Sequence, residues 1–545
     1  MTKMRLAVLV AAAAGGFALA GAHARAQQPR SIAGGQPPRA AMITRAAEAL
    51  GGVERIRSIR NITVAGYGEL AYMNGGGNIS ASPDAPQKWI SIPEYEKTVD
   101  VEHMRMRVRQ RNHQNFVFAG LAGYLGAPNA AVAYLDGDVA FNAAQNNRMA
   151  RANDQAVRAR RIDMLNNPVV LVRAALEPSS RIGNVRTQGG LQLGDVTLAT
   201  GESLTLAIDG ASGVPAWVRW IAHDENLGDV TFRTSFTGYL PVKGVLLPMG
   251  YNTVIDFRNV VQNKLYVDKY GVDESIDDLS APADVRAAAP PAPRAPAPEA
   301  TLVTGGVWLL HGNGGANSVL FEFADHLTMF EAPSSQAWTR ALIDRARSTV
   351  PGKPLTEVIV SHHHFDHTGG IRVAMAEGLT LIAHKGTEPL FREIAARRGT
   401  VAPDALGATP KPLKFRAVDD HLQLKDAAMQ VELYHVVSSS HMAEALFAYV
   451  PGARLLVEGD FFDVGWELYW WQNMYADNIA YRHLQVDTDV PVHGRVLPLA
   501  DVLKDIDRQT KAAADLCART AASGVFPPGC PVKTPSPILQ DAPSR

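Results

Sequence analysis

The chain has 545 residues, of which 46% are hydrophobic and 20% are charged, and its formal net charge is -1. This composition is typical of soluble globular domains, and the length suffices for two hydrophobic cores. A chain of near-neutral charge with no long basic run lacks the electrostatic footprint of a nucleic-acid-binding protein. We therefore expect a small-molecule substrate and no nucleic-acid partner, and the composition leaves the oligomeric state open.

Residues 1–26 have the pattern of an export signal. Lys3 and Arg5 precede an apolar stretch from Leu6 to Ala20, and Ala24-Arg25-Ala26 provides a small-x-small cleavage site before Gln27. The alternative is an N-terminal membrane anchor, but the apolar stretch is short for a span of ~20 residues. No later segment is long and apolar enough to span a membrane. The pattern predicts a periplasmic or secreted protein without an integral membrane span.

Residues 40–280 are predicted to form a β-rich α+β domain. We expect helices over 45–56 and 155–176, and strands in the segments with alternating or β-branched composition, which include Ile62–Gly68, Met104–Arg109, Trp217–Trp220 and Val230–Arg233. The arginines of Met104–Arg109 are interpreted as a solvated sheet face rather than a phosphate-binding surface. Strands that follow an N-terminal helix resemble the curved, half-open sheets of periplasmic lipoprotein carriers.

Residues 281–300 are dominated by proline and alanine and have no periodic apolar face, which predicts a semi-rigid linker. Residues 301–520 then alternate strand and helix, and 521–545 form a tail. We expect a hairpin of strands 306–310 and 318–323, a helix over 335–348, a strand over 356–361, a helix from Gly370 and a strand over 379–384. Cys517 and Cys530 are the only cysteines, and export favours a disulfide between them over two free thiols.

The segment from Ser361 to Gly370 concentrates metal-ligand chemistry directly after an apolar strand, Val358–Val360. Neighbouring buried imidazoles are costly unless a cation compensates for their desolvation. Alternate residues of an extended segment point the same way, so His362 and His364 can hold one ion. Asp366 and His367 follow a bend and can hold a second ion.

Three more candidate ligands follow at the ends of predicted strands: His441, Asp460 and His493. A single buried histidine is more often a hydrogen-bonded core residue than a ligand, but seven candidates in order favour a metal site. His363 is out of phase and is interpreted either as a residue that supports the ligands from behind or as packing. Five other histidines are interpreted as structural residues: His311, His384, His421, His435 and His483.

The ordered motif H-x-H-x-D-H, histidine, aspartate, histidine resembles the metallo-beta-lactamase superfamily over about residues 302–510. The resemblance implies an αββα sandwich with metals along one edge of the paired sheets. It implies one site made of His362, His364 and His441, another made of Asp366, His367 and His493, and a bridging Asp460. Where many members carry Asp-x-Gly after the second strand, this chain has Glu331-Ala332-Pro333. We expect this departure to affect loop geometry rather than a ligand.

Imidazole and carboxylate ligands without cysteine suit two zinc ions, and iron or manganese accept similar donors. The chemistry implied is attack by a metal-bound hydroxide that Asp366 orients as a catalytic residue. Diiron members of the superfamily typically carry glutamate at the position of His364, and its beta-lactamases carry cysteine or serine at that of Asp460. We therefore predict an exported zinc-dependent hydrolase of an ester, thioester or amide bond. The alternatives are a mononuclear iron sulfur dioxygenase of the same fold and a periplasmic ligand carrier with a structural metal domain.

An aromatic stretch lies between Asp460 and His493. It contains Phe461, Phe462, Trp466, Tyr469, Trp470, Trp471 and Tyr475. These rings could wall an apolar substrate pocket beside the metals. The alternative is that they pack the loop against the first domain or against the helix near 478–484.

Overall fold

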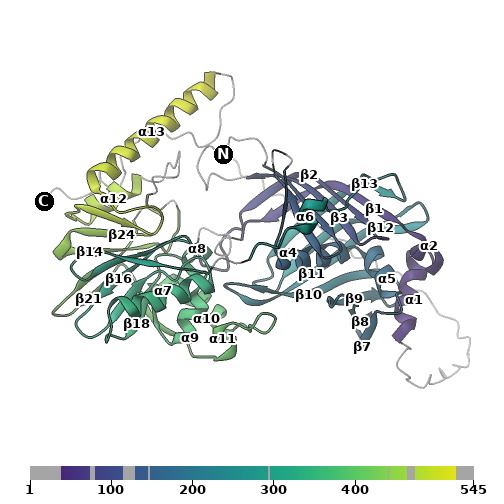
Figure 1. Ribbon diagram of the computed structural model, residues 1–545, viewed down its shortest axis with the longest axis horizontal. Coiled ribbons are helices and arrows are strands. Elements are labelled where there is room, and N and C mark those ends of the chain that lie inside the picture. The colour runs from purple at the N-terminus through teal and green to yellow at the C-terminus, as the bar shows by residue number, and fades with distance from the viewer. Residues whose placement is uncertain are drawn as a thin grey trace, which may run out of the picture. The chain divides into compact units, whose positions relative to one another are not determined.

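The computed structural model describes residues 39–73, 80–114, 129–144, 146, 148–292, 295–437, 439, 441–462 and 473–522 (Figure 1). These residues form three sheets and their covering helices. Among the helices of these ranges, none is both long and apolar enough to cross a membrane.

The first half is built on one antiparallel 13-stranded sheet with the order β6-β5-β4-β3-β2-β1-β13-β12-β11-β10-β9-β8-β7. Its strands are β1 (Asn61–Ala71), β2 (Trp89–Asp100), β3 (Arg105–Gln114), β4 (Asn129–Asp136), β5 (Val139–Ala143), β6 (Met149–Arg151), β7 (Arg181–Gln188), β8 (Leu191–Thr197), β9 (Ser203–Asp209), β10 (Pro215–Asp224), β11 (Gly228–Val242), β12 (Val245–Ile255) and β13 (Val261–Val272). The β-rich character predicted for this half is confirmed.

Helices α1 (Arg39–Leu50), α2 (Val53–Ser58), α4 (Asp154–Leu165) and α5 (Pro168–Ala175) contribute to one apolar cluster with this sheet. Met42, Ile43, Ala46 and Leu50 recur at helical spacing and are almost fully buried there. The carrier alternative would place a ligand against a face of this sheet. Where these helices pack, that face is occupied by the chain's own side chains.

Each of the two helices predicted in this half is broken in two. The helix expected over 45–56 is interrupted between α1 and α2 because Gly51 and Gly52 adopt positive φ values of 137° and 100°. The helix expected over 155–176 is interrupted between α4 and α5. There the Asn167 side chain accepts hydrogen bonds from the N–H groups of Val169 and Val170 and begins a new helix with Pro168 in its first turn.

The arginine stripe of β3 is paired with carboxylates. The Arg105 guanidinium lies 3.0 Å from Asp136, and Arg107 lies 2.6 Å from Asp277 and 3.0 Å from Glu96. Arg107 is buried, with 8% of its surface exposed. The expectation of a solvated face is therefore wrong for Arg107, which is buried and pairs with Glu96 and with Asp277 of the segment that follows β13.

The proline- and alanine-rich segment 281–300 includes a short helix, α6 (Ala283–Ala287). Val285 is buried with Val139 and Phe141 in a small apolar cluster. Strand β14 (Glu299–Thr304) begins at the end of this segment. The segment thus packs in part against the first sheet, while the domain boundaries drawn from the sequence stay a prediction.

The second half contains two further sheets. The 7-stranded sheet consists of β14, β15 (Val307–His311), β16 (Ser318–Glu322), β17 (Leu327–Phe330), β18 (Leu355–Ile359), β19 (Thr380–His384) and β20 (Lys414–Val418). The 6-stranded sheet consists of β21 (His421–Lys425), β22 (Gln430–His435), β23 (Leu446–Val450), β24 (Leu455–Glu458), β25 (Thr488–Pro491) and β26 (Leu497–Pro498). The predicted hairpin is present as β15 and β16, which pair antiparallel.

Three apolar clusters organise these sheets. One is shared by side chains of both sheets, such as Val319 and Val457. A second joins the 7-stranded sheet to helices α7 (Gln336–Thr349), α9 (Ile371–Glu377) and α10 (Glu388–Ala396), which Figure 1 shows together beside β18. A third joins the 6-stranded sheet to α12 (Asn473–Tyr481) and α13 (Leu499–Ala522). The helices predicted over 335–348 and from Gly370 are confirmed as α7 and α9.

The short elements of this half are α8 (Phe365–Thr368), α11 (Ala405–Ala408) and the 3-10 turns Lys385–Thr387 and Pro451–Ala453. Cys517 on α13 is disulfide-bonded, as the sequence favoured, whereas Cys530 lies outside the described residues.

Candidate metal centre

The first ligand segment begins where β18 ends. Residues 360–364 lie outside any strand or helix, with a bend at Ser361, and His364 then forms the N-cap of the single-turn helix α8. His362 Nε2 and His364 Nδ1 lie 3.0 Å apart, so the two side chains converge as the sequence predicted. After the turn of α8 the His367 ring lies 4.0 Å from the His362 ring, centroid to centroid.

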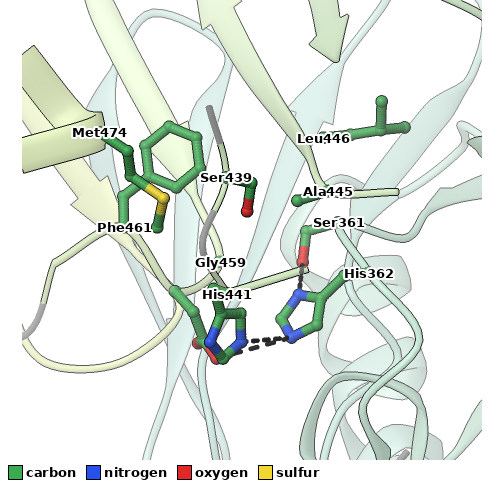
Figure 2. A pocket seen from close by; sticks show the side chains of 10 residues that line it. Ser361, His362, Ser439, His441, Ala445, Leu446, Gly459, Phe461 and Met474 are labelled. Atoms are coloured by element: carbon green, nitrogen blue, oxygen red, sulfur yellow. Dashed lines mark hydrogen bonds and ion pairs between the residues drawn. The ribbon is translucent and has the colours of Figure 1, made fainter. Parts of the chain in front are cut away.

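Two of the other three candidate ligands lie just past strand ends, whereas His441 lies in the loop between two strands and not at the end of a strand as the sequence predicted. His441 stands between β22 and β23, Asp460 follows β24 by two residues, and His493 follows β25 by two residues. Strands β24 and β25 are parallel neighbours, so their carboxyl ends meet at the same sheet edge. Figure 2 shows the side chains of His441 and His362 facing one another.

The seven candidates form two groups that share one carboxylate. His362, His364, His441 and Asp460 make the first group, and Asp366, His367, His493 and Asp460 make the second. Within each group the possible ligand atoms lie within 4.8 Å of one another. All seven residues singled out from the sequence are therefore brought together.

Asp460 divides its two oxygens between the groups. Its Oδ2 lies 2.8 Å from His441 Nε2 and 3.5 Å from His362 Nε2. Its Oδ1 lies 2.9 Å from His367 Nε2 and 3.3 Å from His493 Nε2. A carboxylate placed in this way can contact an ion in each group at the same time.

The spacing of the imidazole nitrogens fits a tetrahedral ion. His362 Nε2 lies 3.0 Å from His364 Nδ1 and 3.3 Å from His441 Nε2. Two nitrogens that bind the same zinc at ~2.0–2.1 Å in tetrahedral geometry are separated by roughly 3.3 Å. The three histidines already occupy positions compatible with one shared cation.

His362 and His364 of the first group are held in the neutral form that binds metals. Burial, followed by the neighbouring His367, lowers the pKa of His362 to about 3. Burial and the adjacent His362 hold the pKa of His364 well below its ordinary value. Neutral imidazole is the ligating form, so these two side chains need not release a proton at neutral pH.

The second group has the opposite electrostatic character. Burial lowers the pKa of His367, but Asp460 and Asp366 raise it by more and hold it well above its ordinary value. For His493, burial is likewise outweighed by hydrogen bonds to Asp366 and Asp460, which raise its pKa to about 9. The carboxylates of this group thus attract positive charge, whether it is carried by protons or by a metal ion.

Two of the imidazoles are oriented through their other ring nitrogen. His362 Nδ1 lies 2.9 Å from Ser361 Oγ, and His367 Nδ1 lies 3.2 Å from Glu331 Oε1. Glu331 is fully buried and also accepts hydrogen bonds from the Ser361 N–H. The expectation that Glu331 affects only loop geometry is therefore wrong, because its carboxylate contacts a candidate ligand directly.

His363 belongs to neither group, and only 1% of its surface is exposed, which agrees with a role in packing or in supporting the ligands. Four of the five other histidines interpreted as structural have side-chain partners nearby. His384 stacks on His435, His421 forms an ion pair with Glu432, and His311 is hydrogen-bonded to Thr301.

The described part of the aromatic stretch contributes one wall of a small cavity. Phe461, Met474 and His441, which Figure 2 labels, line this cavity together with Asp460, and its volume is about 10 Å³. Tyr475 instead packs in the apolar cluster of α12 and donates a hydrogen bond to Asp489. Phe462 is buried in the same cluster. Trp466, Tyr469, Trp470 and Trp471 lie outside the described residues.

Residues 311–482 match the family model described as the metallo-beta-lactamase superfamily. The chain is 33% identical over 75 residues to a linear primary-alkylsulfatase from Pseudomonas sp, a stretch that is 14% of this chain. It spans only 11% of the length of that curated relative.

Two solved structures are similar at low identity. A metallo-beta-lactamase from Pontibacter korlensis aligns with 15% identity and a TM-score of 0.30, over 38% of this chain and 96% of that one. A stereoselective inverting sec-alkylsulfatase from Pseudomonas sp aligns with 16% identity and a TM-score of 0.31, over 42% of this chain and 44% of that one.

Proposed function

We propose that the chain is a metal-dependent hydrolase whose centre is held by the seven clustered residues, because residues 311–482 match the family model of the metallo-beta-lactamase superfamily. The observation that carries the proposal is the position of Asp460, with one oxygen directed to each group. The helix–sheet–sheet–helix layer order typical of the superfamily is supported by the three apolar clusters of this half.

The donor set supports two zinc ions as the resident metals. The first group offers three imidazoles and a carboxylate oxygen, and the second offers two imidazoles and two carboxylates. Nitrogen and oxygen donors in sets of this size suit zinc, while iron and manganese remain compatible. When bound, zinc supplies a water-derived nucleophile near neutral pH and polarises the bond to be cleaved.

Among the candidate ligands, Asp366 is the one whose side chain can accept a proton from an attacking water. Its side chain is 36% exposed, whereas the side chain of Asp460 is 4% exposed. One oxygen of Asp366, Oδ2, lies 3.4 Å from His493 Nε2 and 3.5 Å from His367 Nε2. A carboxylate at the open side of the centre can orient an attacking water and accept its proton.

The bond cleaved is proposed to be an ester, thioester or amide. The curated relative is named an alkylsulfatase, so sulfate esters belong among the candidate substrates. Phe461 and Met474 lie beside Asp460, and on this ground we propose that the substrate carries an apolar part next to the reacting bond. Export is also part of the proposal, and it rests on the charged, apolar and small-residue pattern of residues 1–26.

Metal analysis combined with a substrate panel tests the proposal. Purified full-length protein would be stripped with a chelator, reconstituted with zinc, and assayed on alkyl sulfates, carboxylic esters, thioesters, amides and a beta-lactam. We expect two zinc ions per chain and hydrolysis that is lost on chelation and restored by zinc. Fewer than one bound ion after reconstitution would refute the dinuclear centre. Iron together with thiol-dependent oxygen uptake would favour the dioxygenase alternative.

A further inference from the structure

The turn between β10 and β11, in the first half of the chain, reaches the candidate metal centre. The Asp224 carboxylate shapes this turn by accepting hydrogen bonds from the N–H groups of Asn226 at 2.9 Å and Leu227 at 2.8 Å. These bonds fix the backbone on both sides of the Asn226 side chain. The amide therefore projects from a preorganised turn.

Asn226 contacts the helix that carries two candidate ligands. Its Nδ2 donates hydrogen bonds to the Thr368 carbonyl at 2.9 Å and to Thr368 Oγ1 at 2.8 Å. Thr368 Oγ1 in turn donates to the His364 carbonyl at 2.9 Å. Asn226 has 1% of its surface exposed, and Thr368 has none. A buried chain of hydrogen bonds thus runs from the first half of the chain across both ends of α8.

The turn is also held firmly by its neighbours. Leu227 is buried in the apolar cluster that contains α7 and α9, and its carbonyl accepts a hydrogen bond from Arg397 at 2.8 Å. The Glu225 carbonyl accepts one from Gln336 Nε2 at 2.9 Å. These contacts hold the turn without involving α8. The turn can therefore stabilise the position of α8.

Helix α8 needs such a support. It has four residues, Phe365–Thr368, and an isolated single turn is unstable because nucleation costs more than one hydrogen bond returns. The relative positions of Asp366 and His367 depend on this turn being formed. Groups outside the immediate ligands that orient them commonly change metal affinity by about 10- to 100-fold when they are removed.

We propose that Asn226 is a positioning residue of the metal centre, which acts through Thr368 to fix α8 and hence the ligands Asp366 and His367. The part of this inference that concerns metal affinity rests on the proposed function. The part that concerns the stability of α8 does not. It makes the first half of the chain a structural component of the site.

The test compares Asn226→Ala and the isosteric Asn226→Asp with Gln336→Ala in the full-length chain. Gln336→Ala is the matched control because it removes a hydrogen bond to the same turn without touching α8. The first measurement is amide hydrogen exchange over residues 363–370 in chelated protein. We expect faster exchange in both Asn226 variants and unchanged exchange in the control. Equal exchange in all three proteins would overturn the proposal whatever the metal content.

The second measurement is cobalt titration of the chelated proteins, followed by absorbance. We expect the weaker of two ions to bind at least about 10-fold less tightly in the Asn226 variants, with less than a twofold change in the control. Thermal unfolding identifies any variant that fails to fold, and Thr368→Val then probes the same link from its other side. A wild-type chain that binds no cobalt would refute the proposed function, whereas two ions bound with unchanged affinity in the Asn226 variants would refute this inference.

Discussion

Replacing Asp460 by alanine separates the two halves of the proposed centre. The substitution removes both oxygens that the groups share and leaves three imidazoles on one side and Asp366, His367 and His493 on the other. The first group keeps His362 and His364, whose pKa values are already lowered by burial. The second group loses one of its two carboxylates. We therefore expect the second ion to be lost first, while the three-histidine group remains largely filled.

The size of the effect follows from the burial of Asp460, whose side chain is 4% exposed. Breaking a buried charge pair by removing one partner costs about 3–5 kcal/mol, which corresponds to roughly 100- to 4000-fold in an equilibrium constant. Part of this loss is offset because His367 and His493, without Asp460, release their competing protons more readily. We expect the affinity for the second ion to fall by about 100-fold, and turnover to fall by orders of magnitude with it.

Zinc stoichiometry after dialysis against a calibrated zinc buffer measures this outcome. Asp489→Asn is a suitable control, because Asp489 is a buried carboxylate on the neighbouring strand that belongs to neither group. Asp460→Ser would show whether a hydroxyl in this position supports cleavage of a lactam. If Asp460→Ala retains two ions and near-normal turnover on a wild-type substrate, Asp460 does not bridge the groups and the assignment of the second group is wrong.

Three further outcomes are expected. Glu331→Gln should lower the affinity for the second ion by about 10-fold in a metal titration, because the Glu331 carboxylate orients His367. An unchanged affinity would mean that Glu331 has only a packing role. Residues 301–545 expressed alone should aggregate or unfold, because the cluster around α7 and α9 would lose Leu227 and its neighbours, and a soluble, cooperatively unfolding fragment would contradict this. Burial raises the pKa of Asp489 to about 7 against an opposing hydrogen bond from Tyr475. Because the folded state then holds a proton that the unfolded state releases above about pH 4, stability falls as pH rises from about 4 to 7. In thermal melts Asp489→Asn should gain stability relative to wild type on going from pH 5 to pH 8, and parallel pH profiles would refute this.

The candidate ligands could be predicted from the sequence because their chemistry is unusual for a core. Closely spaced histidines after an apolar strand are costly to bury without a cation, and the alternation of His362 and His364 is a local property of extended backbone. Local pattern also sufficed for α7 and for the hairpin of β15 and β16. The breaks between α1 and α2 and between α4 and α5 were missed, because a continuous apolar pattern outweighed the Gly51-Gly52 pair and the Asn167-Pro168 cap.

The groups that orient the ligands carry no comparable signal. Asp224-Glu225-Asn226-Leu227-Gly228 has the composition of an ordinary turn between two strands, and it lies 142 residues from Thr368 in sequence. Asparagine is common in turns for local reasons, so its residue type does not distinguish a solvent-exposed amide from one that supports a helix. The distinction arises only when the first half of the chain packs its turn against α8. The ligands of such a centre can therefore be recognised from the sequence, whereas the residues that position them cannot. An interpretation that treats each half of the chain separately would miss that Asn226 is hydrogen-bonded to the helix that carries Asp366 and His367.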